Sequence, residues 1–255
     1  MKVYVETKRG FPVNSDIQKA IDGFESLCYD IVPFQHSDIV LGRYDYAATK
    51  NVFVGSIDTM KLLFNRIGKT PEDINYPQFL FDKNLLTRKI SKSILKDVID
   101  NYSGEEVFIK PIKTKLFDGM LVTKKDDFNY FKGYENEPVW ISDKMDIASE
   151  WRVFVHDDKI VHWSNYSGDF TKLPDFNYVS MLRKYYTQQF DNAPRSYTID
   201  VAVLKDVEDK NIGFIKGRTD VVEFNDFWAI GSYGLDCVKY AEMLRDRYKE
   251  IAFEN

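Results

Sequence analysis

Three lysines lie close together in the stretch FIKPIKTKLFDG, residues 108–119, directly after a short apolar run. Lysine is a compact point charge, and lysines grouped beside a strand are typical of a site that binds phosphate. Pro111 ends the hydrogen-bond ladder of the predicted strand, so Lys110 lies at the strand end, where it can reach into a cleft. Lys113 and Lys115 follow in a predicted loop and could fold over the same phosphates. For Lys110 alone, a solvated lysine at a sheet edge is the alternative.

Oxygen-bearing side chains occur in two later apolar strands. In TDVVEFND, Glu223 and Asn225 share one face, because successive side chains of a strand point to opposite faces. Asp200 stands just ahead of another apolar run, in TIDVAVL. Mg²⁺ prefers oxygen ligands such as carboxylates and amide oxygens. The three residues would meet if the two strands pair as a hairpin through residues 205–219. We expect both carboxylates to lie unpaired, so that replacing Glu223 by glutamine relieves repulsion and costs little stability.

A further charged pair lies in the stretch SEWRVFV. Glu150 and Arg152 share one face of the predicted strand, and Trp151, Val153 and Val155 share the other. The apolar face is expected to pack on the core, so the charged face borders a cleft or solvent. An ion pair on an exposed sheet is the alternative interpretation.

Two short stretches resemble phosphate-binding motifs but depart from them in spacing. IGKT, residues 67–70, copies the end of a P-loop, but the first glycine of that motif would fall at Leu63. Gly68 is instead predicted to end a helix. The stretch KLFDG resembles the Lys-x-Asp-Gly motif of lysine-adenylating nucleotidyltransferases with one residue too many. In a strand, that residue turns Lys115 to the face opposite Asp118.

The elements that must position these residues are suggested by hydrophobic periodicity. In the first 70 residues we predict strands at 2–6, 30–34, 38–42 and 51–56, with helices at 15–27, begun by a Ser15 or Asp16 cap, and at 57–67. A basic helix is predicted at 84–102. Later strands are predicted at 106–110, 119–123, 138–142, 149–155, 159–166, 198–204 and 219–225, and helices at about 176–190 and 235–252. This order indicates an α/β layer followed by an α+β body.

Composition limits the class of protein. The chain has 255 residues, of which 44% are hydrophobic and 29% charged, enough for one large domain or for two or three small ones sharing a cleft. Its net charge of −5 does not favour nucleic acid as a partner. Cys28 and Cys237 match no disulfide or zinc spacing. Since no apolar run approaches the length of a membrane span, we expect a cytoplasmic protein.

Taken in order, seven residues resemble the pattern of ATP-grasp enzymes: Lys110, Lys115, Glu150, Arg152, Asp200, Glu223 and Asn225. More narrowly, the chain is similar to the clade named for one arginine and two lysines, which is often found in bacterial and phage genomes. The segments that carry the resemblance run from about residue 50 to 236: NVFVGSIDTM, FDKNLLTRKI, VFIKPIKTKLFDG, PVWIS, SEWRVFV and VVEFNDFWAIGSYGLD.

The resemblance implies an α+β ATP-grasp fold with an N-terminal α/β domain (1–88), a central subdomain with the lysines (89–143) and a C-terminal subdomain with the metal site (144–255). It implies ATP and Mg²⁺ as cofactors. The expected ATP-binding residues are Lys110, Lys113 and Lys115 for phosphate, Trp140, Ile141 and Ser142 for adenine, Glu150 for ribose, and Arg88. The expected metal ligands are Asp200, Glu223 and Asn225. Arg152 and Lys115 are the expected catalytic residues, and the loop AIGSYG is expected near the acceptor.

The implied reaction is ligation of a carboxylate to an amine or thiol through an acyl phosphate. The acceptor, whether amino acid, peptide or protein, is left open, and no membrane partner is expected. Many ATP-grasp ligases place an arginine two residues before the first metal aspartate, where this chain has Thr198. Arg152 or Arg218 is expected to supply that charge. A lysine-adenylating nucleotidyltransferase and a catalytically silent nucleotide-binding protein are the alternatives.

Overall fold

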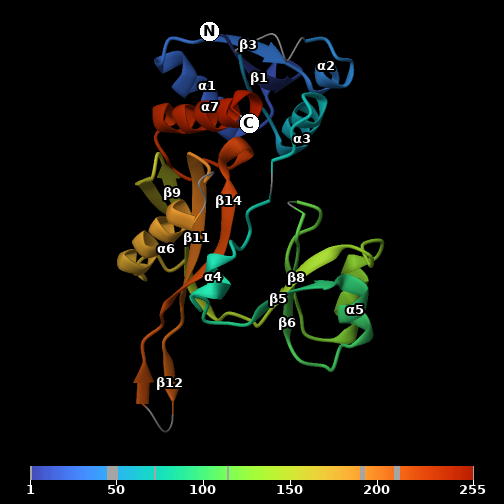
Figure 1. Cartoon of the computed structure of the whole chain (residues 1–255), viewed down its shortest axis with the longest axis vertical. Helices are drawn as coiled ribbons and strands as arrows, with labels where there is room; N and C mark the ends of the chain where they lie inside the picture. Colours follow the sequence, from blue (N-terminus) through green and yellow to red (C-terminus); the bar gives the residue numbers. More distant parts are fainter. Residues whose placement is uncertain are drawn as a thin grey trace.

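The computed structural model describes residues 2–44, 51–71, 73–113, 115–189, 193–209 and 213–254. It contains three main sheets, each with its own hydrophobic core (Figure 1). In the first sheet, β1 (Lys2–Lys8) lies between the parallel strands β3 (Asp30–Phe34) and β4 (Val52–Val54), and the short β2 (Phe11–Pro12) pairs antiparallel with β1. The predicted α/β layer is therefore present.

Four helices accompany this sheet: α1 (Ser15–Ser26), α2 (His36–Val40), α3 (Ile57–Arg66) and, from the other end of the chain, α7 (Cys237–Phe253). The helix α1 begins at Ser15 as predicted, but its N-cap is Asn14 and not Ser15 or Asp16, because the side chain of Asn14 accepts the backbone N–H of Ile17 at 2.9 Å. The strand predicted at 38–42 is wrong. This segment forms α2 and the turn after it, and Asp38 accepts the backbone N–H of Gln35 at the helix start.

The helices α1 and α7 cross very closely (Figure 1). A Cβ atom added to Gly23 of α1 would lie 2.0 Å from the carbonyl oxygen of Cys237. Residues of α7, among them Tyr240 and Leu244, share one core with Val3, Ile17 and Phe24. The last helix of the chain thus completes the first layer.

The second sheet is antiparallel, in the order β5 (Ile90–Ile94), β8 (Pro138–Ser142), β6 (Val107–Pro111), β7 (Met120–Val122). Its core includes residues of α5 (Leu95–Asp100) and of the 3₁₀ helix η1 (Lys125–Phe131). The helix predicted at 84–102 is therefore wrong over most of its length. Residues 90–94 pair with β8, because tertiary pairing overrides the helix propensity of the surrounding leucines and lysines.

The third sheet has the order β10 (Lys159–Gly168), β9 (Ile147–His156), β11 (Ser196–Leu204), β14 (Thr219–Asp226), and all its pairs are antiparallel. The apolar face of β9 and β11 shares a core with Val179, Leu182 and Tyr186 of α6 (Phe176–Gln189). The opposite face carries Arg152 and Asp200, as the predicted alternation requires.

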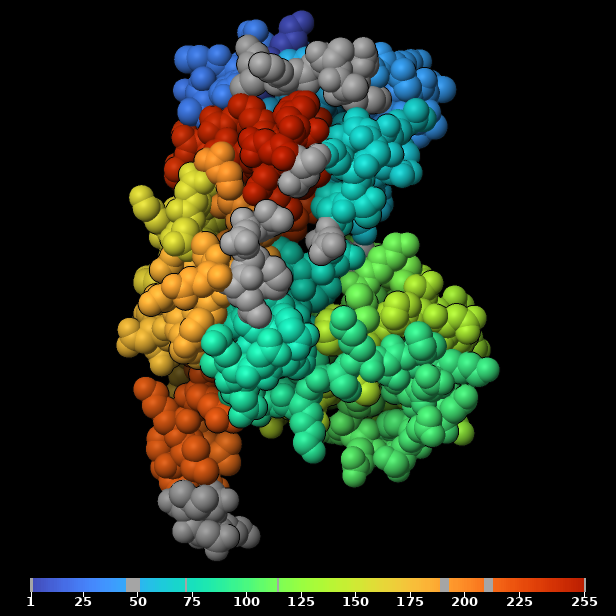
Figure 2. Space-filling view, viewed as in Figure 1, coloured from blue at the N-terminus to red at the C-terminus, as the bar shows by residue number. Residues whose placement is uncertain are grey.

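Between β11 and β14 the chain forms the small hairpin of β12 (Val207–Asp209) and β13 (Gly213–Ile215), which projects from the body of the molecule (Figure 2). Two short elements complete the chain, α4 (Phe79–Asp82) and the 3₁₀ helix η2 (Phe227–Ala229).

The mixture of helices with separate parallel and antiparallel sheets confirms the α+β class. The division at residues 88 and 143 stays a prediction; α7, from the third predicted segment, packs in the first layer. No helix within the described ranges is both long enough and apolar enough to cross a membrane.

Candidate active site

Two cavities meet beside β14. The first, about 450 Å³, lies between the second sheet and β14, and we call it the inter-sheet cavity. The second, about 660 Å³, lies between the third sheet and the N-terminal layer, and we call it the layer cavity. Four residues line both: Asn75, Lys115, Glu223 and Asn225. A molecule in one cavity would therefore lie next to a molecule in the other.

Charged residues from three adjacent strands meet at this boundary. Asp200 of β11 stands directly opposite Glu223 of β14 and Arg152 of β9 in the strand register. Arg152 donates two hydrogen bonds to Asp200, from Nε to Oδ1 at 2.8 Å and from Nη2 to Oδ2 at 2.6 Å. Asp200 is only 1% exposed, so this bidentate pair is shielded from water.

A second ion pair connects the two sheets. Lys110 Nζ at the end of β6 donates to Glu223 Oε2 at 2.7 Å. The side-chain amide of Asn225 donates to Glu223 Oε1 at 3.0 Å and to Asp200 Oδ2 at 3.3 Å. The expected hairpin pairing thus does bring Asp200, Glu223 and Asn225 together. The expectation that the two carboxylates lie unpaired is wrong, because each has a cationic partner.

These contacts change the acidity of the groups. Burial opposes ionisation of Glu223, but the charge and hydrogen bond of Lys110 lower the pKa of this carboxyl below its ordinary value. Burial by itself would lower the pKa of Lys110, and the Glu223 carboxylate raises it instead. Burial raises the pKa of Asp200, an effect that Arg152 opposes. Lys110 is therefore a cation and Glu223 an anion at neutral pH.

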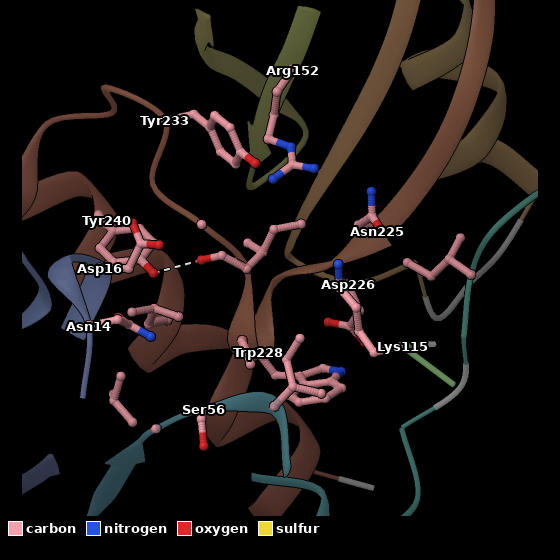
Figure 3. Close-up of a pocket in the computed structure, with 18 of the residues that line it drawn as sticks. Asn14, Asp16, Ser56, Lys115, Arg152, Asn225, Asp226, Trp228, Tyr233 and Tyr240 are labelled. Atoms are coloured by element: carbon pink, nitrogen blue, oxygen red, sulfur yellow. Dashed lines mark hydrogen bonds between the residues drawn. The ribbon is translucent and has the colours of Figure 1, made fainter. Parts of the chain in front are cut away.

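Two tyrosines surround the guanidinium of Arg152. Its carbon lies 4.5 Å from the ring centroid of Tyr233 and 5.8 Å from that of Tyr166. The hydroxyl of Tyr166 donates to Glu150 Oε1 at 3.3 Å, so Glu150 does face the site together with Arg152. Figure 3 shows Arg152 and Tyr233 on one wall of the layer cavity, with Asn14 and Asp16 on another and Lys115 and Asn225 across from them. Tyr233 belongs to the loop expected near an acceptor.

The remaining predicted residues fall into two groups. Lys115, with a left-handed backbone (φ +59°), lines both cavities, and Ser142 lines the inter-sheet cavity together with Asp143, Lys144 and Met145. Three others are missing from the described lining of both cavities: Lys113, Trp140 and Ile141. Trp140 instead packs against Tyr76 and Phe81.

Three further residues of the sequence pattern are Arg88, Arg218 and Thr198. Arg88 lines the inter-sheet cavity, but it pairs with Asp220 at 2.8 Å and donates to the carbonyl of Val221 at 2.7 Å. Arg88 links the segment before β5 to β14, and Asp220 balances its charge. Arg218 donates to the carbonyl of Thr87 at 3.5 Å. Thr198, where the resemblance would place an arginine, is fully buried, and within the described residues its hydroxyl has no hydrogen-bond partner.

Sequence reasoning missed several lining residues, including Asn14, Asp16, Asn75 and Tyr76. The ring of Tyr76 lies 4.5 Å from Lys110 Nζ, and Asn75 has a left-handed backbone (φ +50°). Both follow Pro71 in an irregular stretch, in which periodicity carries no signal. An asparagine before an aromatic residue and a proline was the available sign of a turn.

The donor set suits a small divalent cation. In the described part of the chain, no group of three or more His, Cys, Asp or Glu side chains is placed to hold a metal ion. The amide of Asn225 has an oxygen and a nitrogen of similar shape, and half a turn about χ2 exchanges them. Glu223 and the Asn225 amide oxygen then face the cavities, and Asp200 lies behind them, bound by Arg152. Carboxylate and amide oxygens are the hard ligands that Mg²⁺ prefers.

Comparisons with known proteins identify a matching family and solved structures of similar fold. The family described as ATP-grasp domain, R2K clade family 2, matches residues 85–243. Macrocyclase MdnC bound with precursor peptide MdnA, from Microcystis aeruginosa MRC, is 15% identical with a TM-score of 0.54, over 96% of this chain and 99% of that one. D-alanine–D-alanine ligase from Bacillus anthracis is 14% identical with a TM-score of 0.54, over 99% and 98%.

A RimK domain ATP-grasp protein from Sphaerobacter thermophilus DSM 20745 is 13% identical with a TM-score of 0.51, over 97% of this chain and 99% of that one. No curated protein matches the chain. At such identities the solved structures share the fold with this chain, and that fold is the one the sequence resemblance implied. The family match spans more than half of the chain, and the chain therefore belongs to the R2K clade of ATP-grasp domains.

Proposed function

We propose that the protein is an ATP- and Mg²⁺-dependent ligase that joins a carboxylate to an amine or thiol through an acyl phosphate. One observation carries this proposal. Lys110, Glu223 and Asn225 meet where a cavity between two sheets adjoins a second cavity, and Asp200 lies buried behind them, hydrogen-bonded to Asn225. Cationic groups for phosphate and oxygen ligands for a metal thus lie between two adjacent binding spaces. Membership of the ATP-grasp family supports the same interpretation.

The inter-sheet cavity is the proposed nucleotide site. Its apolar lining suits a flat purine ring and includes Phe108, Leu121, Met145 and Val222. We assign the adenine-facing backbone to residues 142–145 in place of the predicted 140–142, because Trp140 and Ile141 point into cores. Glu150 is the proposed ribose contact, and Lys110 and Lys115 the proposed phosphate contacts.

Asp200, Glu223 and Asn225 are the proposed Mg²⁺ ligands. When bound, the metal ion would neutralise charge on the ATP phosphates. Arg152 fixes the orientation of Asp200 through two hydrogen bonds. Lys110 holds Glu223 at 2.7 Å and is also within the nucleotide cavity, so it can exchange the carboxylate for phosphate oxygens.

The layer cavity is the proposed site of the acid and its acceptor. A carboxylate oxygen held there would attack the γ-phosphorus, and ADP would leave. The amine or thiol would then attack the acyl carbon, losing its proton to solvent as phosphate departs. Lys115 lines both cavities, and Arg152 uses Nε and Nη2 for Asp200, which leaves Nη1 for a ligand. Both cations would stabilise negative charge that develops during transfer.

The acceptor is an amino acid, a peptide end or a protein side chain. A cavity of about 660 Å³ accommodates an amino acid or the end of a peptide. The solved relatives include a D-alanine–D-alanine ligase and a macrocyclase bound with its precursor peptide. Both kinds of acceptor therefore belong in a substrate screen.

Product analysis tests the proposal. The purified protein would be incubated with ATP, Mg²⁺ and a panel of amino acids and peptides, and we expect ADP and phosphate in equal amounts together with a ligated product. Intact mass should stay unchanged, because KLFDG departs from the nucleotidyltransferase motif by one residue. A stable gain matching AMP would indicate lysine adenylation instead. Nucleotide binding without turnover across a broad panel would favour a silent binding protein.

A further inference from the structure

Asn75 connects the two halves of the proposed nucleotide site. It lies in the irregular stretch before α4, with a left-handed backbone (φ +50°), and it lines both cavities. Asparagine is one of the few residues other than glycine that adopt this conformation without a large penalty.

The backbone of Asn75 binds the strand of the proposed metal ligands. Its carbonyl accepts the backbone N–H of Phe224 at 2.7 Å, as an isolated bridge on the outer edge of β14. Phe224 is the residue between Glu223 and Asn225. Asn75 therefore fixes the backbone of β14 at the point from which both proposed ligands project.

The side chain of Asn75 binds the segment of the phosphate lysines. Its Nδ2 donates to the carbonyl of Ile112 at 2.9 Å. Ile112 follows Lys110 by two residues and precedes Lys115 by three. One residue thus holds the start of the lysine segment with its side chain and the metal strand with its backbone.

This link does not depend on the ion pair beside it. Lys110 joins the same two sheets through Glu223. If Lys110 exchanges that carboxylate for phosphate, the ion pair is lost from the connection between the sheets. The two hydrogen bonds of Asn75 involve main-chain groups that a nucleotide does not need, so they persist through the exchange.

We propose that Asn75 is a positioning residue, which sets the distance between the phosphate-binding lysines and the metal ligands of β14. This inference rests on the proposed function, because the nucleotide site is part of that proposal. Asn75 is proposed to contact neither the γ-phosphorus nor the carboxylate oxygen that attacks it. It acts through Ile112 and Phe224, and its contribution to nucleotide affinity should grow with the number of phosphates on the nucleotide.

The substitution Asn75→Gly isolates the side-chain bond. Glycine keeps the left-handed backbone and the carbonyl that binds Phe224, and it removes only the donor to Ile112. Asn84→Gly is the matched control, because Asn84 has almost the same backbone angle (φ +51°) but lies exposed after α4. Asn75→Asp keeps the size of the side chain and replaces the N–H donor by a carboxylate, which cannot donate to a carbonyl.

Binding of Mg²⁺ with a non-hydrolysable ATP analogue would be compared with binding of AMP by calorimetry. We expect Asn75→Gly and Asn75→Asp to weaken the analogue by about three- to tenfold, the range for one hydrogen bond, and to leave AMP within about twofold. Asn84→Gly should change neither. Trypsin cleavage after the exposed Lys113 and Lys115 should be faster in both Asn75 variants than in Asn84→Gly, since the start of the lysine segment is no longer held.

Equal nucleotide affinities and cleavage rates in Asn75→Gly and Asn84→Gly would overturn the inference. So would a loss of AMP binding as large as the loss of the triphosphate analogue, which would indicate general disruption of the fold. If the wild-type protein binds no nucleotide, the proposed function fails. The cleavage rates would still decide whether Asn75 holds the lysine segment.

Discussion

The negative charge of Glu223 is balanced by Lys110 and oriented by Asn225. We therefore expect Glu223→Gln to lower the free energy of unfolding by about 1.5–3 kcal/mol at neutral pH, the range for a hydrogen bond to a charged group. Urea denaturation measures this loss. An unchanged or raised stability would instead support the expectation from sequence, in which the substitution relieves repulsion between unpaired carboxylates.

The same pair implies a pH dependence. The folded-state pKa of Glu223 is lowered from 4.5, so its stabilising contribution is complete above the unfolded pKa and is lost as the pH falls through the folded pKa. We expect the stability difference between wild type and Glu223→Gln to be constant near neutrality and to shrink below about pH 4.5. Denaturation curves across the acid range would show this, and a difference that grows with acidity would contradict the pairing.

Lys110 and Lys113 offer a matched comparison. Lys110 is fixed by Glu223 and by the ring of Tyr76, whereas Lys113 is exposed and outside both cavity linings. Lys110→Met should weaken Mg–ATP binding by about 1.5–3 kcal/mol, as expected for a charge-assisted contact. Lys113→Met should have little effect. Similar losses in a calorimetric titration would mean that Lys110 does not bind phosphate.

The helices α1 and α7 cross closely at the N-terminal wall of the layer cavity. A Cβ on Gly23 would overlap the backbone of Cys237 and lie 2.8 Å from Ala241 Cβ. Gly23→Ala must separate the helices, and we expect it to cost about 1–3 kcal/mol of stability, the usual range for overpacking. A thermal melt measures the effect, with the exposed Glu25→Ala of the same helix as control. A variant as stable as the control would show that α7 can move at little cost.

Strands with strict alternation were predictable. Alternation predicted that Arg152 and Asp200 lie opposite the apolar face of β9 and β11, and that Glu223 and Asn225 share a face of β14, and the structure brings the four together. Alternation did not predict the register shift after Asp200, by which Val221 lies in the core and Val222 lines the inter-sheet cavity. The segments at 38–42 and 84–102 were not predictable from periodicity, because local hydrogen bonds of Asp38 and strand pairing with β8 determine them. Asn75 comes from an irregular stretch, where only three-dimensional contacts reveal a role, whereas the resemblance already placed the loop of Tyr233 near the acceptor.

The sequence also did not reveal which cation pairs with which carboxylate. Lys110 and Glu223 are 113 residues apart, and Arg152 and Asp200 are 48 apart. A face-sharing pattern says which side chains point the same way within one strand. It does not say which strands become neighbours, so the cations could not be assigned to their carboxylates.

The proposed nucleotide site joins two sheets with separate cores. A ligand that contacts both should stabilise the protein by about 2.7 kcal/mol at a concentration one hundred times its Kd. In hydrogen exchange, we expect Mg–ATP to slow the amides of β6, β7 and β14 together, and to leave those of β1 and β3 unchanged. Protection confined to one sheet would mean that the nucleotide does not bridge them.

The last helix of the chain completes the core of the first layer, which has a consequence for biosynthesis. The buried faces of β1 and α1 are covered in part by α7, whose residues emerge from the ribosome more than two hundred positions later. At about 5–20 residues per second, this interval lasts roughly 10–40 s. During that time the nascent N-terminal segment displays Phe24 and its neighbours to the surrounding solution. A cell that makes this protein must therefore keep an incomplete apolar layer from aggregating until α7 has been synthesised.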